Sequence, residues 1–159
     1  MILIALGANL PSPAGLPAET LIQALSLLVQ RDITIERQSG FYRTAAWPNP
    51  QDPPFINAVA SIRTALPPAQ LLRLLHDTEE VFGRERGVAN APRTLDLDII
   101  DYDGRVENGP PVLPHPRMHT RLFVLCPLRE IAPDWLHPVS GLSVSQLIAA
   151  LPASDIRRV

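Results

Sequence analysis

Asp96 and Asp98 stand near the middle of the chain, in a run where apolar and acidic residues alternate from 95 to 99. Successive side chains of a strand point to opposite faces, so the apolar residues would enter a core and the two carboxylates would lie side by side. Like charges at this spacing repel unless a cation lies between them, and Mg²⁺ prefers oxygen ligands completed by water and phosphate. The pattern predicts a magnesium-phosphate site on a strand. The alternative is a half-exposed strand with a solvated acidic face.

Basic side chains flank this run on both sides. Enzymes that move phosphate groups need fixed positive charge around the transferred group and little other chemistry. The sequence has no glycine-rich phosphate loop, no Cys/His spacing typical of zinc and no G-x-S-x-G elbow, which disfavours P-loop, Rossmann and hydrolase classes. For any single arginine, plain solubility is the alternative. The flanking cations are Arg84, Arg86, Arg93, Arg117 and Arg121, with His115 and His119.

Phe55 and Asn57 share one face of another expected strand and follow a long proline-rich loop. An aromatic ring next to an amide suits a flat heterocycle, because the amide offers both a donor and an acceptor. The alternative is a core phenylalanine with a capping asparagine.

Composition sets the class of protein. The 159 residues are 46% hydrophobic and 19% charged, with a net charge of −2, which is typical of one globular domain and gives no general attraction to nucleic acid or membranes. The apolar run at 2–6 lacks a basic lead and is too short for a signal or a membrane span. The single cysteine, Cys126, excludes an intrachain disulfide. We therefore expect a cytoplasmic protein with one domain over 1–159.

The order of the expected elements predicts an α+β fold. The expected strands are at 1–8, 33–42, 55–66 and 92–100, and the expected helices are at 17–30 and 67–82. Their order along the chain is βαββαβ, which is that of a ferredoxin-like sandwich. Such a fold has a mainly antiparallel sheet with its helices on one face, and we expect the other face to be free for the two aspartates. The C-terminal additions comprise a short strand near Val106, an irregular stretch at 109–120, an apolar run at 122–131 and a helix at 143–151. We expect them to cover a sheet edge or the helix layer.

At this point the residues match a known family. The chain resembles the 6-hydroxymethyl-7,8-dihydropterin pyrophosphokinases of folate biosynthesis over nearly its whole length, and the run at 92–99 is the most diagnostic part. The resemblance implies a ferredoxin-like fold, ATP as donor, a pterin alcohol as acceptor, two Mg²⁺ ions, AMP as product and a monomer. The other matching segments are 5–10, 41–44, 57–59, 113–116, Met118, Arg121, Phe123, 127–128 and 130–133.

The resemblance also implies roles for individual residues. Phe55 and Phe123 would sandwich the pterin ring, Asp96 and Asp98 would hold the metal ions, and the backbone of Ile99 would meet the adenine. The implied pterin-binding residues are Thr44, Ala45, Trp47, Phe55, Asn57 and Phe123. The implied ATP-binding residues are His76, Glu79, Arg86, Arg93, Ile99, His115 and Arg121. The implied catalytic residues are Arg86, Arg93, Asp96, Asp98 and Arg121.

The chain departs from the family pattern in the loop at 84–91. Ala89 and Asn90 stand near positions where the family has a basic residue and an aromatic one, and the loop is one residue short. His76 also replaces a common glutamine. The loops at 11–14, 45–54 and 84–91 are expected to close over substrates. Because the loop at 84–91 is altered, two alternative functions stay open. One is a slow or non-catalytic homologue that binds pterin and nucleotide, and the other is another Mg²⁺-dependent phosphotransferase.

Overall fold

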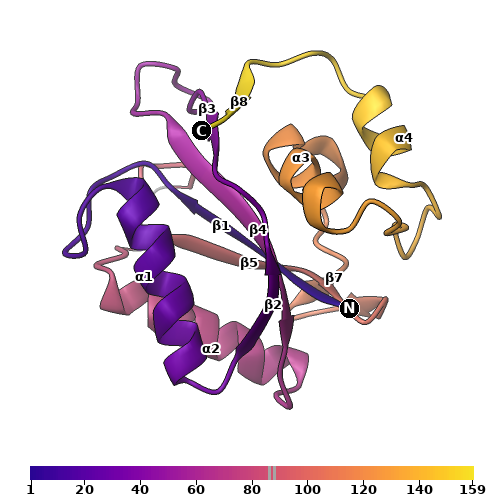
Figure 1. The fold of residues 1–159 in the computed structure, drawn as a ribbon, viewed down its shortest axis with the longest axis horizontal. Helices are drawn as coiled ribbons and strands as arrows, with labels where there is room; N and C mark the ends of the chain where they lie inside the picture. The colour runs from indigo at the N-terminus through magenta and orange to yellow at the C-terminus, as the bar shows by residue number, and fades with distance from the viewer. Residues whose placement is uncertain (86, 88) are drawn as a thin grey trace.

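A twisted sheet forms the centre of the molecule, with a pair of helices on each face (Figure 1). The computed structural model describes residues 1–85, 87 and 89–159. The elements are β1 (Ile2–Ala8), α1 (Pro17–Gln30), β2 (Thr34–Gln38), β3 (Tyr42–Thr44), β4 (Phe55–Arg63), α2 (Pro68–Val81), β5 (Asp96–Tyr102), β6 (Glu107–Asn108), β7 (Val112–Leu113), a 3₁₀ turn (Met118–Thr120), α3 (Leu122–Ile131), α4 (Val144–Ala149) and β8 (Ile156–Arg158).

The large sheet has the order β5-β1-β4-β3-β8, with β2 pairing β4 beside β3, and all of these pairings are antiparallel. The α+β class is confirmed, and the arrangement is consistent with a ferredoxin-like fold. The strand expected over 33–42 is split in two. Between its parts, Ser39 stays bonded to Val59 of β4, since its amide donates to the Val59 carbonyl and its hydroxyl accepts from the Val59 amide.

One core lies between the sheet and the helices α1 and α2. Leu95, Leu97 and Ile99 are all buried in it, as the alternating pattern predicts, together with the apolar faces of the two helices. Prolines fix where these helices begin, because a proline in the first turn loses no helical hydrogen bond. Helix α2 ends before Gly83, whose φ of +81° suits a glycine after a helix. The first core thus orients β5 so that its acidic residues point away from α1 and α2.

A second core covers part of the opposite face, where α3 and α4 pack (Figure 1). Leu3, Val59 and Ile100 of the sheet meet Val124 and Leu128 of α3 there. The prediction that the C-terminal segments cover a sheet edge or the first helix layer is therefore wrong for α3 and α4, although β7 does lie beside the edge strand β5, and the opposite face is only partly free. The reason is that the segment at 122–131 is a helix with a buried stripe, and this stripe needs an apolar surface that only the far face of the sheet offers.

The remaining C-terminal elements are small. The short strand expected near Val106 is confirmed as β6, which pairs with β7 inside the stretch expected to be irregular. Strand β8 was not predicted, and it extends the sheet beyond β3. None of the helices in the described ranges is both long enough and apolar enough to cross a membrane.

Candidate active site

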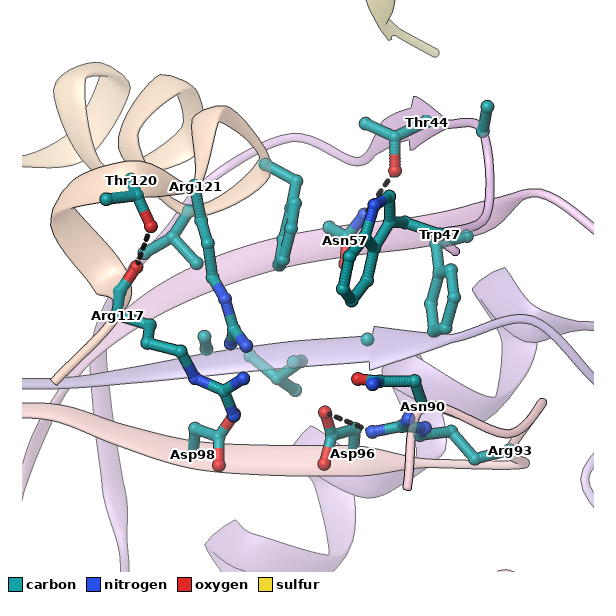
Figure 2. Close-up of a pocket in the computed structure, with 17 residues that line it drawn as sticks. Thr44, Trp47, Asn57, Asn90, Arg93, Asp96, Asp98, Arg117, Thr120 and Arg121 are labelled. Carbon is teal, nitrogen blue, oxygen red and sulfur yellow. Dashed lines mark hydrogen bonds and ion pairs between the residues drawn. The ribbon is translucent and has the colours of Figure 1, made fainter. Parts of the chain in front are cut away.

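A cavity of about 400 Å³ opens on the part of the sheet that α3 leaves uncovered. Figure 2 shows it between the sheet, the start of α3 and the loop that follows β3. The structure brings together two predicted groups in this one cavity. The first comprises all six residues predicted for the pterin, Thr44, Ala45, Trp47, Phe55, Asn57 and Phe123; the second comprises Arg93, Asp96, Asp98 and Arg121.

The residues of the first group form one end of the cavity, which is lined by aromatic rings and an amide. Phe55 and Asn57 come from β4, whereas Phe123 comes from the first turn of α3. Asn57 is 5% exposed, and its Nδ2 donates a hydrogen bond of 3.1 Å to Oγ1 of Thr44 (Figure 2). This bond fixes the orientation of the amide, so its oxygen and its second N–H are presented in a fixed direction. The loop after β3 adds Trp47, which is 71% exposed at the cavity mouth.

Strand β1 supplies the floor between the two ends. Gly7 pairs with Asn57 of β4 on one side and with Asp96 of β5 on the other. A Cβ atom at this position would lie 2.9 Å from Oδ1 of Asn57, closer than real contacts allow. Ala5, two residues earlier, pairs with Asp98. Small residues on β1 therefore keep the floor open, and the contact with Asn57 explains why position 7 is a glycine.

The second group forms an acidic end lined with arginines. Asp96 and Asp98 lie on the same face of β5, as predicted, and both line the cavity. Removal from bulk water and the neighbouring charge of Asp96 raise the pKa of Asp98 to about 6. Figure 2 shows the side chains of Arg117 and Arg121 reaching toward Asp98 from the α3 side.

Two further arginines hold Asp96. Arg84 donates to Oδ1 of Asp96 at 2.9 Å and to the carbonyl of Leu95 at 2.8 Å, and it also pairs with the buried Glu79 of α2. Arg93 donates to Oδ2 of Asp96 at 3.2 Å. Both carboxylate oxygens of Asp96 thus already face cations. Arg84 is absent from the predicted site residues, although its position among the flanking cations could have indicated it.

The aromatic rings and the arginines are also in contact with each other. The guanidinium carbon of Arg93 lies 5.9 Å from the ring centre of Phe55, and that of Arg121 lies 5.5 Å from the ring centre of Phe123. Each ring is therefore flanked by a cation that belongs to the acidic end. The ring-lined end of the cavity therefore lies directly beside the charged groups.

His115 is a different case from the arginines. Its Nε2 lies 3.9 Å from Oδ2 of Asp98, and its Nδ1 accepts a hydrogen bond from the backbone N–H of Arg117. Burial and the charge of Arg121 lower the pKa of His115 to about 4. The imidazole is therefore neutral near pH 7, so it contributes a hydrogen-bonding group to this end and no positive charge.

The carboxylate pair has the chemistry that Mg²⁺ requires. The two side chains are adjacent on one strand face and offer only oxygen atoms, which are the ligands Mg²⁺ selects. Among the described residues, no cluster of three or more His, Cys, Asp or Glu side chains could hold a metal ion alone. An ion bound there would therefore take its other ligands from water and phosphate, as Mg²⁺ commonly does with nucleotides.

Several predicted nucleotide-binding residues lie outside the cavity lining. Glu79 is buried on α2 in its ion pair with Arg84, and the side chain of Ile99 is in the first core. His76 lies on α2, and His115 lies beside Asp98. Arg86 falls outside the residues that the structure describes. The roles of these residues toward a nucleotide remain predictions.

Asn9 is a residue of the site that sequence reasoning missed. It is 2% exposed, its Nδ2 donates to the carbonyl of Pro53 at 3.0 Å, and its Oδ1 accepts from the backbone N–H of Arg93 at 2.8 Å. One side chain therefore joins the end of the loop at 45–54 to the segment that carries Arg93. The available signal was a polar residue immediately after a buried strand.

A flat slot beside paired carboxylates and arginines suits an enzyme that transfers a phosphate-containing group to a small ring compound. The family model for 7,8-dihydro-6-hydroxymethylpterin-pyrophosphokinase (HPPK) matches residues 3–133. The chain belongs to this family.

Relatives give the same result. The chain is 45% identical over 125 residues to the 2-amino-4-hydroxy-6-hydroxymethyldihydropteridine pyrophosphokinase of Synechocystis, covering 78% of this chain and 64% of that protein. It is 35% identical over 157 residues to the protein of that name from Methylorubrum extorquens, covering 98% of this chain and 96% of that one. It is also 34% identical over 159 residues to the folic acid synthesis protein fol1 of Pneumocystis carinii, covering 99% of this chain and 21% of that protein. The match thus spans less than two thirds of the first and third of these relatives.

Proposed function

We propose that the protein transfers a pyrophosphoryl group from ATP to 6-hydroxymethyl-7,8-dihydropterin in folate biosynthesis. Family membership and the names of the relatives support this reaction. The observation that carries the proposal is that an aromatic and amide end adjoins a carboxylate and arginine end within one cavity. A donor of phosphate and a flat acceptor can meet there without any movement of the sheet.

In this proposal the acceptor ring lies between Phe55 and Phe123, with its polar edge against Asn57 and Thr44. The slot is apolar on its faces and polar on one edge, as a pterin is. The fixed amide of Asn57 gives the donor and acceptor pattern that distinguishes one heterocycle from another. Ala45 and Trp47 would close the outer side of the slot.

Asp96 and Asp98 would hold two Mg²⁺ ions together with the phosphates of ATP. Bound there, the metal would supply positive charge to the phosphate oxygens and lower the pKa of a coordinated hydroxyl. Arg93 and Arg121 line the same end and would stabilise charge on the transferred group. The hydroxymethyl oxygen attacks the β-phosphorus and loses its proton, the bond from the β-phosphorus to the α–β bridging oxygen breaks, and AMP leaves with the electron pair.

The products of one assay test the reaction. The purified protein is incubated with ATP, Mg²⁺ and the pterin alcohol, and the nucleotides are separated and quantified. We expect AMP and the pterin diphosphate in equal amounts. ADP or free pyrophosphate would indicate another Mg²⁺-dependent phosphotransferase. Pterin binding without AMP would indicate a non-catalytic homologue, for which the altered loop at 84–91, with Asn90 on the cavity wall, is the observation in favour.

Asp103→Asn is the matched control for Asp96→Asn in this assay. Asp103 follows the same strand, is exposed, and pairs with the terminal amine of Met1. The same chemical change there should leave AMP formation intact. A loss in the Asp96 variant alone would then be due to the site.

We also propose that 1–159 acts as one ferredoxin-like domain, as a monomer, in the cytoplasm. Two cores share one sheet, which supports the single domain. Light scattering during size-exclusion chromatography would test the monomer.

A further inference from the structure

The C-terminal strand β8 borders the ring-binding end of the cavity. Strand β3 has three residues, and its last one, Thr44, holds the amide of Asn57. On its inner side β3 pairs with β4; on its outer side it pairs with β8, where Thr44 faces Ile156 and Tyr42 faces Arg158. Without β8, this short strand would have a free edge, and the cavity loop at 45–54 would start from it. The position of Thr44 therefore depends on β8.

A single carboxylate fastens β8 to the rest of the molecule. Glu130, near the end of α3, accepts hydrogen bonds from Nη2 and Nε of Arg158 at 3.1 and 3.3 Å. It also accepts one from the hydroxyl of Tyr42 at 2.6 Å and one from the backbone N–H of Gly40 at 2.9 Å. Arg158 is the main cause that lowers the pKa of Glu130 to about 2, so the junction is ionised at neutral pH. Three segments, α3, the β2–β3 turn and β8, thus meet at one side chain.

Gly40 shows how closely these segments approach. A Cβ atom there would lie 2.6 Å from Nη2 of Arg158 and 2.7 Å from its Cζ, so the guanidinium lies directly against the backbone of this turn. The next carbonyl along the chain, that of Phe41, accepts from the N–H of Val159 at 2.8 Å. Strand β8 therefore packs closely against the turn before β3, in addition to pairing with the edge of β3.

The helix that carries Glu130 also carries Phe123 at its other end. The two residues lie about 10 Å apart along α3, at 1.5 Å per residue. Glu130 therefore ties the helix wall of the slot, which bears Phe123, to the strand wall, which bears Thr44. None of the described cavity-lining residues at the acidic end belongs to β8 or to this junction.

We propose that β8, fastened by Arg158 to Glu130, is a positioning element for the ring-binding end of the cavity. It fixes Thr44, and with it Asn57, relative to Phe123, while the acidic end is set by other contacts. Arg158 and Glu130 touch no substrate in this proposal; they act through the strand and the helix. The inference rests on the proposed function, because it assigns pterin binding to that end.

Arg157 provides a matched control on the same strand. Its side chain forms an ion pair with Asp155, two residues away, and both side chains are 76% exposed. Arg157→Ala removes the same charge and the same side chain without touching Glu130. Arg158→Lys keeps the charge but loses the bidentate hydrogen bonding to Glu130, so its pterin dissociation constant should lie between those of wild type and Arg158→Ala.

The experiment measures two dissociation constants for each variant. One is for the pterin alcohol, from its fluorescence; the other is for a Mg²⁺ complex of a non-hydrolysable ATP analogue, from calorimetry. For Arg158→Ala we expect the pterin constant to rise about three- to tenfold and the nucleotide constant to stay within about twofold. For Arg157→Ala both constants should match wild type. Equal rises in both constants, or no rise in either, would overturn the proposal.

Amide hydrogen exchange separates this inference from the proposed function. If the wild-type protein makes no AMP, the function fails, yet exchange still tests the positioning in the free protein. Arg158→Ala should increase exchange in the peptide that holds 42–44, and Arg157→Ala should not. Unchanged exchange in the Arg158 variant would refute the inference whatever the activity of the protein.

Discussion

Gly7→Ala should separate ligand binding from folding in this protein. Gly7 lies within β1, in an extended conformation that any residue adopts, and the hydrogen atom that alanine would replace points toward Asn57 on the cavity floor. The added methyl carbon would lie 2.9 Å from Oδ1 of Asn57. Asn57 cannot swing away freely, because it is buried and bonded to Thr44. The amide that would recognise the pterin must therefore shift or lose its bond to Thr44.

The size of the effect follows from these contacts. Loss of one hydrogen bond between a buried amide and its partner costs about 1–3 kcal/mol, which corresponds to a factor of about 5 to 160 in the dissociation constant. The substitution also has a stabilising effect, because alanine in place of glycine at a compatible position raises the free energy of unfolding by about 0.4–1 kcal/mol. Pterin binding should therefore weaken at least about fivefold, while the free energy of unfolding falls by no more than about 2–3 kcal/mol, because the backbone gain offsets part of the lost bond.

Fluorescence titration with the pterin alcohol and thermal unfolding measure the two quantities. Ala8→Gly is the control, because Ala8 is the next residue of β1, points to the opposite face and is fully buried in the first core. That variant should lower the melting temperature and leave the pterin dissociation constant unchanged. Pterin binding by a stable Gly7→Ala variant within about twofold of wild type would show that Asn57 does not recognise the ring.

Three further outcomes are expected. Asp96→Asn should reduce AMP formation by at least about a hundredfold while the protein stays folded, measured by the nucleotide assay against circular dichroism; near-normal turnover would contradict the metal assignment. Asn9→Ala should lower the free energy of unfolding by about 1–3 kcal/mol in denaturant titrations, because it removes both hydrogen bonds of this buried side chain. The lowered pKa of Glu130 makes the junction with Arg158 stabilising above about pH 5 and progressively lost as the pH falls toward 2. The shift in the pKa of Glu130 corresponds to about 3 kcal/mol of folding stability, and solvent screening at this partly exposed side chain reduces the contribution to about 1 kcal/mol. Glu130→Gln should remove this part of the acid dependence of unfolding.

The sequence predicts those parts of the fold that depend on residues close together in the chain. Strict alternation places Leu97 in the core and Asp96 on the other face, prolines mark where α1 and α2 begin, and Gly83 marks where α2 ends. The position of α3 has no such cause, because an amphipathic helix does not specify which apolar surface it will cover. Strand β8 has three residues and little pattern, and it is held by Arg158 through Glu130, which is 28 residues away. Only the folded chain brings that pair together.

The same distinction applies to the site. The aspartate pair, the arginines and the Phe55/Asn57 face follow from residue types and spacing, whereas the complete pterin set came from the family resemblance. Gly7 and Asn9 were missed as site residues for physical reasons. The role of Gly7 depends on its register with two neighbouring strands, and the role of Asn9 depends on two loops that approach each other in space. Neither contact follows from the order of residues alone, although a polar residue directly after a buried strand marks Asn9 as a candidate.

The two ends of the cavity are built with different kinds of support. The acidic end relies on buried contacts: Asn9 is 2% exposed and Arg84 is 14% exposed in its pairs with Glu79 and Asp96. The ring-binding end relies on a junction at the surface, where the side chain of Arg158 is 60% exposed. Buried polar contacts are costly to break, whereas exposed ion pairs contribute little each and are screened by salt. We therefore expect the charged end to be harder to perturb, and small changes near the C-terminus to act mainly on the ring-binding end.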